Sequence, residues 1–348
     1  MKKNRFMENQ SVLITGVAGT VGRELLRQVV GEGPVEVIGL DNNETELFFE
    51  SEEYRNHSNV HLYLGDIRDR DKLMRKMRGV DVVLHAAALK HVILCEQSPR
   101  DPVQTNILGT QNVIDAAMAN GVKRVIFTSS DKAVNPTNVM GTTKLMGERM
   151  ITAANAHRRR NGTIFASTRF GNVLGSRGSV IPLFRRQIAT GGPITLTDVK
   201  MTRFIMTLTE AARLVMDSVP LAKGGEVFVT KMPVVRIADL AEIMIEELAP
   251  RYGHKPEKIE IQVIGSKAGE KLYEELMNDE ETRRTIELND YFVVKPAFSS
   301  VYEYVDYQYE GMVREGVDRP YNSALERVMS KEDLSNYMLT NDLLSEGK

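Results

Sequence analysis

Three residues that can move protons or polarise bonds stand in a row: the hydroxyl of Ser130, the carboxyl of Asp131 and the amine of Lys132. A predicted helix follows, with Lys144 on it and Met140 four residues earlier on the same helix face. A thioether neither accepts nor donates a catalytic proton. Acid–base chemistry at this place therefore rests on Asp131 and Lys132, unless the site is catalytically silent.

The first element that must position these residues is a glycine-rich turn near the N-terminus. An apolar run at 11–15 predicts a buried parallel strand, and an amphipathic helix is predicted to continue to residue 30. Gly16 permits the tight turn, Gly19 lets the backbone approach a pyrophosphate, and Gly22 lets helix and strand pack closely. The first two glycines are three residues apart, a variant of the usual dinucleotide fingerprint. The predicted phosphate contacts are Gly16, Gly19, Thr20, Val21 and Gly22.

Three further apolar runs predict strands whose ends meet the rest of a dinucleotide. The run at 36–41 ends in Asp41, near the distance expected for a carboxylate that binds the adenosine ribose hydroxyls. This carboxylate would repel a 2′-phosphate, so it predicts NAD rather than NADP. The run at 60–66 is expected to end near the adenine, and the run at 80–88 supplies small side chains where backbone must approach a ligand. The predicted contacts from these two runs are Asp66, Ile67, Ala86 and Ala87.

Strands and helices alternate along the chain, which predicts an α/β fold: a Rossmann-like, doubly wound and mainly parallel sheet. In such sheets ligands bind at the carboxyl ends of the strands, where the acid–base residues stand. We assign residues 1–172 to an NAD-binding domain, to which 208–248 return, and residues 173–207 and 249–348 to a smaller C-terminal substrate-binding domain. Helices are predicted at 106–120, 141–160, 210–219 and 236–248, strands at 124–129, 164–170 and 226–230, and polar loops across 172–207.

Composition fits an enzyme without nucleic-acid or membrane partners. The 348 residues suffice for a substantial core, and a net charge of −2 attracts neither nucleic acid nor an anionic surface. Cys95 is the only cysteine, which excludes an intrachain disulfide and fits a reducing compartment. No apolar run approaches the ~20 residues of a membrane span, and the polar first residues do not resemble a signal peptide. We therefore expect a cytoplasmic protein, and no metal site, because the six histidines show no ligand spacing.

Five segments together resemble a known family, the nucleotide-sugar-modifying extended short-chain dehydrogenases. The likeness is to the polysaccharide-biosynthesis UDP-N-acetylglucosamine 4,6-dehydratases, in the group that carries Met where other members carry a catalytic Tyr, and we expect a soluble form of that group. Two departures occur: Ser130 replaces a common Thr, and Lys267-Ala268 replace the usual Arg-Pro. The matching segments are 15–22, 86–92, 130–141, 169–173 and 269–272.

The resemblance implies a redox-neutral dehydration with NAD as cofactor. Oxidation at C4 of the sugar acidifies the C5 hydrogen, a base removes that hydrogen, water leaves from C6, and hydride returns to C6. By resemblance Lys132 is the C5 base and Asp131 the C6 acid, while Lys144 binds the nicotinamide ribose hydroxyls. The C4 hydroxyl also needs a base, and we assign Ser130 to that role, relaying the proton through water to another group. The reaction requires a neutral lysine and a protonated aspartate, and a plain salt bridge between the two is the alternative.

The resemblance also implies a UDP-sugar substrate and a homo-oligomer, a dimer or larger. Lys90 and His91 follow the fourth strand and are expected to reach the substrate, although a structural role is open for His91. Asn172 can bind a uracil or phosphate edge, Arg203 can pair with a diphosphate, and Glu270 can accept from a ribose hydroxyl. For each of the three a loop or capping role is the alternative. Two other functions stay open: a nucleotide-sugar 4-epimerase, disfavoured by the missing Tyr, and a non-catalytic dinucleotide-binding regulator.

Overall fold

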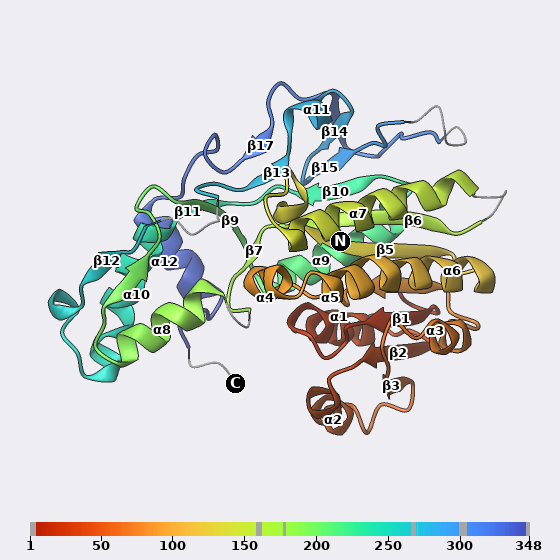
Figure 1. Ribbon diagram of the computed structural model, residues 1–348, viewed down its shortest axis with the longest axis horizontal. Coiled ribbons are helices and arrows are strands. Elements are labelled where there is room, and N and C mark those ends of the chain that lie inside the picture. Colours follow the sequence, from red (N-terminus) through yellow and green to blue (C-terminus); the bar gives the residue numbers. More distant parts are fainter. Residues whose placement is uncertain are drawn as a thin grey trace. The chain divides into compact units, whose positions relative to one another are not determined.

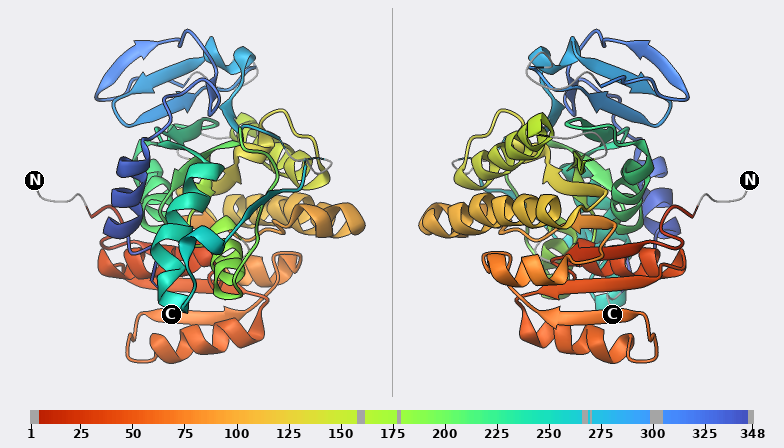
Figure 2. Two further views of the ribbon diagram at one scale, coloured as in Figure 1. Left: turned by 90° about the vertical axis from the view of Figure 1, so that its left-hand side faces the viewer. Right: turned by 90° about the vertical axis from the view of Figure 1, so that its right-hand side faces the viewer.

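A large sheet dominates the computed structural model, which describes residues 5–157, 162–176, 179–265, 269, 271–298 and 305–345. Within these residues the sheet is 10-stranded, in the order β16-β14-β15-β10-β6-β5-β4-β1-β2-β3. Figure 1 shows this order from β3, at the lower edge, upward to β15 and β14, and Figure 2 shows the same succession from two further sides. The parallel strands are β1 (Ser11–Thr15), β2 (Glu36–Asp41), β3 (Val60–Leu64), β4 (Val82–His85), β5 (Arg124–Ser130), β6 (Ile164–Phe170) and β10 (Val227–Thr230). The antiparallel strands are β15 (Tyr291–Val294), β14 (Thr285–Leu288) and β16 (Met312–Glu315).

The strand order determines where a ligand can bind. Strands β3-β2-β1-β4-β5-β6 have the order of doubly wound dinucleotide-binding folds, which confirms the predicted fold class. The order reverses between β1 and β4, so the segments after these two strands separate and open a crevice at their carboxyl ends. Thr15 and His85 are partners in the register of this pair. The glycine turn and Ala86-Ala87 therefore begin side by side.

Helices cover both faces of the sheet, because the direction in which successive strands are added reverses between β1 and β4. On one face α1 lies beside α9, where Gln28 Nε2 donates to Thr209 O at 3.1 Å. On the other face α3, α6 and α7 pack over a buried apolar cluster that includes Val83, Val113 and Phe127. The bounds are Thr20–Gly31 for α1, Arg70–Lys76 for α3, Thr110–Asn120 for α6, Val139–Ala154 for α7 and Leu208–Leu221 for α9.

Shorter helical segments complete the first part of the chain. The helix predicted at 106–120 is a π-helical stretch, η1 (Val103–Gly109), followed directly by α6, which ends at Gly121 in the left-handed conformation (φ 67°). No helix in the described ranges is both long enough and apolar enough to cross a bilayer. The other short segments are α2 (Glu44–Glu53), α4 (Val92–Gln97), α5 (Arg100–Pro102), η2 (Asp131–Ala133), η3 (Asn155–His157) and α11 (Asp279–Thr282).

The chain divides into two compact units, and their boundaries differ from the sequence-based assignment. Helix α10 (Ile237–Leu248), assigned above to the NAD-binding domain, belongs to the second unit because it packs against α8 (Val180–Ala189) and α12 (Lys331–Thr340). Residues 278–320, assigned above to the substrate-binding domain, belong to the first unit because β15, β14 and β16 continue its sheet beyond β10. The first unit is Met1–Phe170, Thr209–Lys231 and Asn278–Pro320, and the second is Gly171–Leu208, Met232–Met277 and Tyr321–Lys348.

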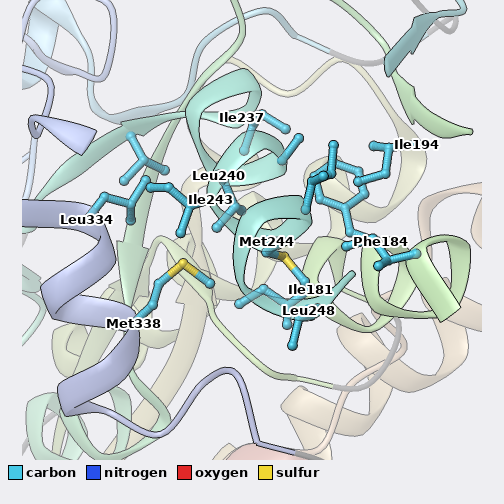
Figure 3. Close-up of a cluster of buried hydrophobic side chains, with 14 of the residues drawn as sticks. Ile181, Phe184, Ile194, Ile237, Leu240, Ile243, Met244, Leu248, Leu334 and Met338 are labelled. Carbon is cyan, nitrogen blue, oxygen red and sulfur yellow. The ribbon is translucent and has the colours of Figure 1, made fainter. Parts of the chain in front are cut away.

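The second unit has its own core, formed by α8 (Val180–Ala189), α10 and α12 (Lys331–Thr340) (Figure 3). The expectation of polar loops across 172–207 is wrong for α8, because Ile181, Phe184 and Ile188 recur at helical spacing and are buried. The remaining elements of this unit are β7 (Asn172–Val173), β8 (Ile194–Leu196), β9 (Thr202–Met206), β11 (Val234–Arg236), η4 (Pro250–Tyr252), η5 (Pro256–Lys258), β12 (Ile261–Val263), β13 (Glu275–Met277) and β17 (Tyr321–Asn322).

A buried ion cluster fixes α7 onto the large sheet. Arg169, on β6, donates to Glu148 of α7 through Nε at 2.9 Å and Nη2 at 2.7 Å. Its Nη1 and Nη2 also donate to Glu281 of α11, at 2.8 Å each. All three side chains are at most 4% exposed. Such burial is tolerated because each charge touches an opposite charge and is hydrogen-bonded to it.

Replacing Arg169 by methionine would leave the buried Glu148 without its hydrogen-bonded counter-charge and Glu281 with Arg284, 3.5 Å away. We expect the free energy of unfolding to fall by about 3–5 kcal/mol, measured by urea denaturation near neutral pH. The matched control is Arg314→Met, which breaks exposed pairs with Glu287 and Asp318 and should change stability little. Equal losses of unfolding free energy in the two variants would show that the buried cluster stabilises the fold no more than the exposed pairs do.

Candidate functional site

Asp131 and Lys132 form an ion pair at the carboxyl end of β5. Lys132 Nζ donates to Asp131 Oδ2 at 2.9 Å and to Oδ1 at 3.1 Å. Ser130 caps the short helix η2 that carries both residues, since its Oγ accepts from Lys132 N at 3.1 Å. The Asp131 side chain is 6% exposed and that of Lys132 36%. The three predicted acid–base residues therefore form one local unit, in which the lysine is the partner that reaches solvent.

Helix α7 approaches this unit closely because Gly141 has no side chain. A Cβ at Gly141 would lie 2.2 Å from Lys132 O, so no larger residue fits without moving the backbone. Asn138 caps the helix, and its Oδ1 accepts from Gly141 N at 2.8 Å. Met140 lies in this first turn and is 3% exposed. Its thioether is buried packing, so the residue that replaces the usual Tyr offers no proton.

Lys144 lies one turn further along α7 and points back to the end of β5. Its Nζ donates to Thr128 O at 2.9 Å and stands 4.9 Å from the ring centroid of Phe127. Burial lowers the pKa of Lys144 to about 8, against the opposing effect of Glu148, four residues on. The amine is thus fixed by a backbone carbonyl and is less firmly protonated than a surface lysine.

Asn106 is a structural centre of the site that the sequence interpretation missed. Its Oδ1 accepts from Leu89 N at 2.8 Å, and its Nδ2 donates to Leu89 O at 3.0 Å and to Thr143 Oγ1 at 3.0 Å. It therefore joins the segment before Lys90 to the helix that carries Lys144. Asn106 lies in the π-helix η1, a distortion that is frequent at functional sites. The signal in the sequence was an asparagine at the start of a helix predicted to be amphipathic, and the structure shows that this asparagine is buried.

The glycine turn has the shape that a dinucleotide pyrophosphate needs. Gly16 has φ +71°, and a Cβ there would lie 2.7 Å from Ala87 N, so the turn and the Ala86-Ala87 segment touch through backbone. A Cβ at Gly22 would lie 2.0 Å from Gly16 O. Helix α1 begins at Thr20 without a side-chain cap, which leaves its first N–H groups for an anion. The residues therefore fit a dinucleotide pyrophosphate, and the phosphate contacts expected at Gly16, Gly19, Thr20, Val21 and Gly22 stay predictions.

Two carboxylates lie where the adenosine end of a dinucleotide is expected. Asp41 Oδ2 accepts from Ala18 N and its Oδ1 from Asn43 N, both at 2.9 Å, so this side chain also holds the glycine turn. Asp66 pairs with Arg68, whose guanidinium hydrogen bonds hold the pKa of Asp66 at about 2. Ile67 is 4% exposed, because it packs against the backbone of η1. Contacts of these residues with the nucleoside stay predictions.

The predicted substrate contacts are divided between the two units. Lys90 and His91 are exposed in the first unit, where His91 begins α4. Asn172, on β7, and Arg203, on β9, belong to the second unit. Glu270 lies outside the described residues. Their roles toward a nucleotide sugar stay predictions.

Arg203 has a structural task, of the kind left open above as the alternative to a diphosphate contact. Its Nη1 donates to Thr202 O at 2.8 Å and Leu272 O at 3.2 Å, and its Nη2 to Lys271 O at 2.9 Å. Nε lies 3.3 Å from Glu274 Oε1. The guanidinium thus holds residues 271–274 against β9, and most of its N–H groups already have acceptors within the chain. Among the residues that the structure describes, no group of three or more His, Cys, Asp or Glu side chains is placed to hold a metal ion.

The strand order, the glycine turn and the lysine-bearing helix after β5 define a dinucleotide-binding protein of the extended short-chain dehydrogenase class. The chain belongs to the polysaccharide biosynthesis protein family, whose sequence profile matches residues 12–296. The family expected from the motifs is thereby confirmed.

Several proteins are similar to this chain in sequence, and two of those described next are named for a reaction on a nucleotide sugar. An uncharacterised membrane protein of Methanocaldococcus jannaschii is 52% identical over 84% of this chain and 88% of its own length. A UDP-N-acetylglucosamine 4,6-dehydratase (inverting) of Campylobacter jejuni is 37% identical over 88% and 89%. A UDP-glucose 4-epimerase of Rickettsia rickettsii is 35% identical over 97% and 98%. Two further bacterial relatives, each 43% identical, are matched over only 46% and 47% of their own length.

Among solved structures, the Bacillus thuringiensis protein Pen is similar throughout. It has a TM-score of 0.89 and 44% identity, covering 98% of this chain and 100% of that one. The chain is thus similar to nucleotide-sugar dehydratases and epimerases in sequence, and to Pen in its complete fold.

The buried position of Lys144 predicts a pH-dependent stability. Below about pH 8 the lysine is protonated in both folded and unfolded chains, and the cost of burying its charge is fully present. Between pH 8 and its usual pKa of 10.5 the unfolded chain binds this proton and the folded chain does not, so the contribution to the free energy of unfolding rises with pH. Relative to Lys144→Met, wild type should gain up to about 3 kcal/mol over this window, measured by urea denaturation at several pH values. A constant difference would mean that the amine is hydrated rather than buried.

Proposed function

We propose that this protein is an NAD-dependent nucleotide-sugar 4,6-dehydratase, a hydro-lyase that converts UDP-N-acetylglucosamine to a UDP-4-keto-6-deoxy-N-acetylhexosamine for surface polysaccharide or glycan biosynthesis. The observation that carries the proposal is the contact between Asp131 and Lys132 at the carboxyl end of β5, beside a helix whose Tyr position holds Met140. Dehydration needs one base and one acid close together, in addition to hydride transfer. The similarity to the Campylobacter jejuni enzyme supports the same substrate class.

The ion pair is the resting state of an acid–base couple. One proton passing from Lys132 Nζ to Asp131 gives a neutral amine and a carboxylic acid across the 2.9 Å contact. The amine then takes the C5 proton, and the acid gives its proton to the departing C6 hydroxyl, so that water leaves. After this elimination Lys132 is an ammonium and Asp131 a carboxylate. C5 takes back a proton when hydride returns to C6, and the proton lost from the C4 hydroxyl makes up the balance, so the original pair is restored. A salt bridge and a catalytic couple are therefore two protonation states of one arrangement.

The remaining site residues orient the cofactor and the C4 hydroxyl. Bound NAD supplies the hydride acceptor at C4 and the donor at C6. Lys144 is fixed by Thr128 O, and its remaining N–H groups can donate to the nicotinamide ribose. The C4 hydroxyl must lose its proton when hydride leaves C4, and we assign the Ser130 hydroxyl, which accepts from Lys132 N, to receive that proton and relay it through water to another group. The Asp41 carboxylate at the ribose end favours NAD over NADP.

A 4-epimerase is the second candidate, because the Rickettsia rickettsii relative of that name is similar over almost the whole chain. Epimerisation needs proton removal at C4 but no acid at C6, so it would leave Asp131 and Lys132 without a chemical task. A non-catalytic regulator would bind NAD without turning over any sugar.

The decisive test is product analysis by NMR in D2O. Purified protein with UDP-N-acetylglucosamine should give a 4-keto sugar whose C6 is a methyl group and whose C5 carries deuterium. Retention of the C6 oxygen in a C4-inverted product would establish the epimerase instead. Unchanged substrate, with every common UDP- and GDP-hexose, would reject both activities.

Three variants separate the acid–base roles. Lys132→Ala should stop C5 deprotonation and leave the bound nicotinamide reduced, which absorbance detects, and Asp131→Asn should slow water loss and accumulate the 4-keto intermediate. Met140→Tyr should give equal or lower turnover, because a ring and hydroxyl overfill the space of a buried thioether. A large rate gain in Met140→Tyr, together with near-normal Lys132→Ala, would mean a degraded Tyr-dependent site in which the ion pair is only structural.

A further inference from the structure

His85, the last residue of β4, lies fully buried beside the site, and neither the proposed reaction nor the predicted cofactor contacts use it. Its Nδ1 is 2.7 Å from Thr15 Oγ1, at the end of β1, and its Nε2 is 3.1 Å from Thr110 Oγ1, at the start of α6. Each hydroxyl has only one proton to donate. The direction of each hydrogen bond between the imidazole and the two hydroxyls can therefore be worked out.

The neighbouring contacts decide which nitrogen carries the proton. Thr110 Oγ1 donates to Asn106 O at 2.7 Å, which uses its only proton. His85 Nε2 must then be the donor in its contact with Thr110. In the neutral ring Nδ1 is left as an acceptor, and it receives the proton of Thr15 Oγ1. Thr15 Oγ1 in turn accepts from Ala87 N at 3.3 Å, so every group in the network has a partner.

The surroundings also keep the ring neutral. Burial lowers the pKa of His85 to about 3, and the charge of Lys144 adds to this effect. A protonated ring would put a hydrogen on Nδ1, facing a hydroxyl that already accepts from Ala87 N. The Thr15 proton would then lose its acceptor in a buried place, which costs free energy.

The same residue joins the segments that form the cofactor site. Through Thr15 it is linked to the glycine turn, which begins one residue later and touches Ala87 through backbone. The His85 carbonyl accepts from Thr128 Oγ1 at 3.2 Å, and Thr128 O is the acceptor that fixes Lys144. Four segments, from β1, β4, β5 and the start of α6, therefore meet at His85.

We propose that His85, held as the neutral Nε2–H tautomer, is a positioning residue that sets the spacing between the glycine turn and the carbonyl that orients Lys144, and thereby the affinity for the dinucleotide. It acts through Thr15, Thr110 and Thr128, because its own side chain is fully buried. The proposal rests on the proposed NAD site but not on the sugar chemistry, so cofactor binding tests it even where no sugar is turned over.

The tautomer is tested directly by long-range proton–nitrogen correlation NMR of labelled protein. The His85 signals, assigned by comparison with His85→Gln, should show an unprotonated Nδ1 and a protonated Nε2, unchanged between about pH 6 and 8. A ring protonated at Nδ1, or one that titrates in this range, would overturn the network.

The positioning role is tested with paired threonine variants, measured by calorimetric titration of NAD into protein freed of bound nucleotide. Thr110→Val removes the acceptor of Nε2–H and should weaken NAD binding about tenfold, while Thr110→Ser keeps the hydroxyl and should restore wild-type affinity. Thr168→Val is the control: it removes another fully buried hydroxyl, on β6, whose contact with Phe127 O is a long 3.5 Å.

Thermal unfolding separates positioning from general damage. Thr110→Val should lower the melting temperature more than Thr168→Val, because it leaves His85 Nε2–H without an acceptor, so affinity is measured well below both melting temperatures, where only Thr110→Val should bind NAD more weakly. Unchanged NAD affinity in Thr110→Val, or an equal loss of affinity in Thr168→Val, would overturn the positioning role.

Discussion

The site depends on how closely the backbone of α7 approaches the turn after β5. Gly141 meets Lys132 O at a separation that a single Cβ would reduce to 2.2 Å. This approach brings the first turn of a helix against the segment of Asp131 and Lys132, the proposed acid–base pair. Once α7 is there, Met140 is buried, and Lys144, one turn later, reaches Thr128 O. A bulkier residue at position 141 would push α7 away from the turn after β5 and would displace Met140 and Lys144 together.

The first half of the fold was predictable from sequence because its signals are local. Buried parallel strands are short apolar runs, and the glycine turn and the acid at the end of β2 stand at fixed offsets from them. The Asp131–Lys132 contact was equally accessible, because the two residues are adjacent. The same reasoning missed α8, where polar residues between Ile181 and Ile188 hid a buried helical face.

Contacts between distant parts of the chain could not be predicted from one sequence. Residues 278–320 return to the large sheet as antiparallel strands, and nothing in their composition indicates which edge they join. The π-helical geometry at Asn106 and the acceptors of Arg203 are likewise set by tertiary packing. Arg203 illustrates the difficulty, because an arginine suited to a diphosphate is equally suited to three backbone carbonyls.

Charge balance under α7 shows how such a distant contact can influence a residue of the candidate site. Arg169 carries one positive charge between Glu148 and Glu281, and Arg284, 3.5 Å from Glu281, carries a second. Lys144 is buried four residues before Glu148, and Glu148 opposes the lowering of its pKa by burial. If Glu281 were absent, Arg169 would neutralise Glu148, and Lys144 would lose part of the field that helps to keep it protonated. A residue far along the chain thus influences the charge of the site lysine, although it belongs to a segment that joins the sheet at its opposite edge from β3.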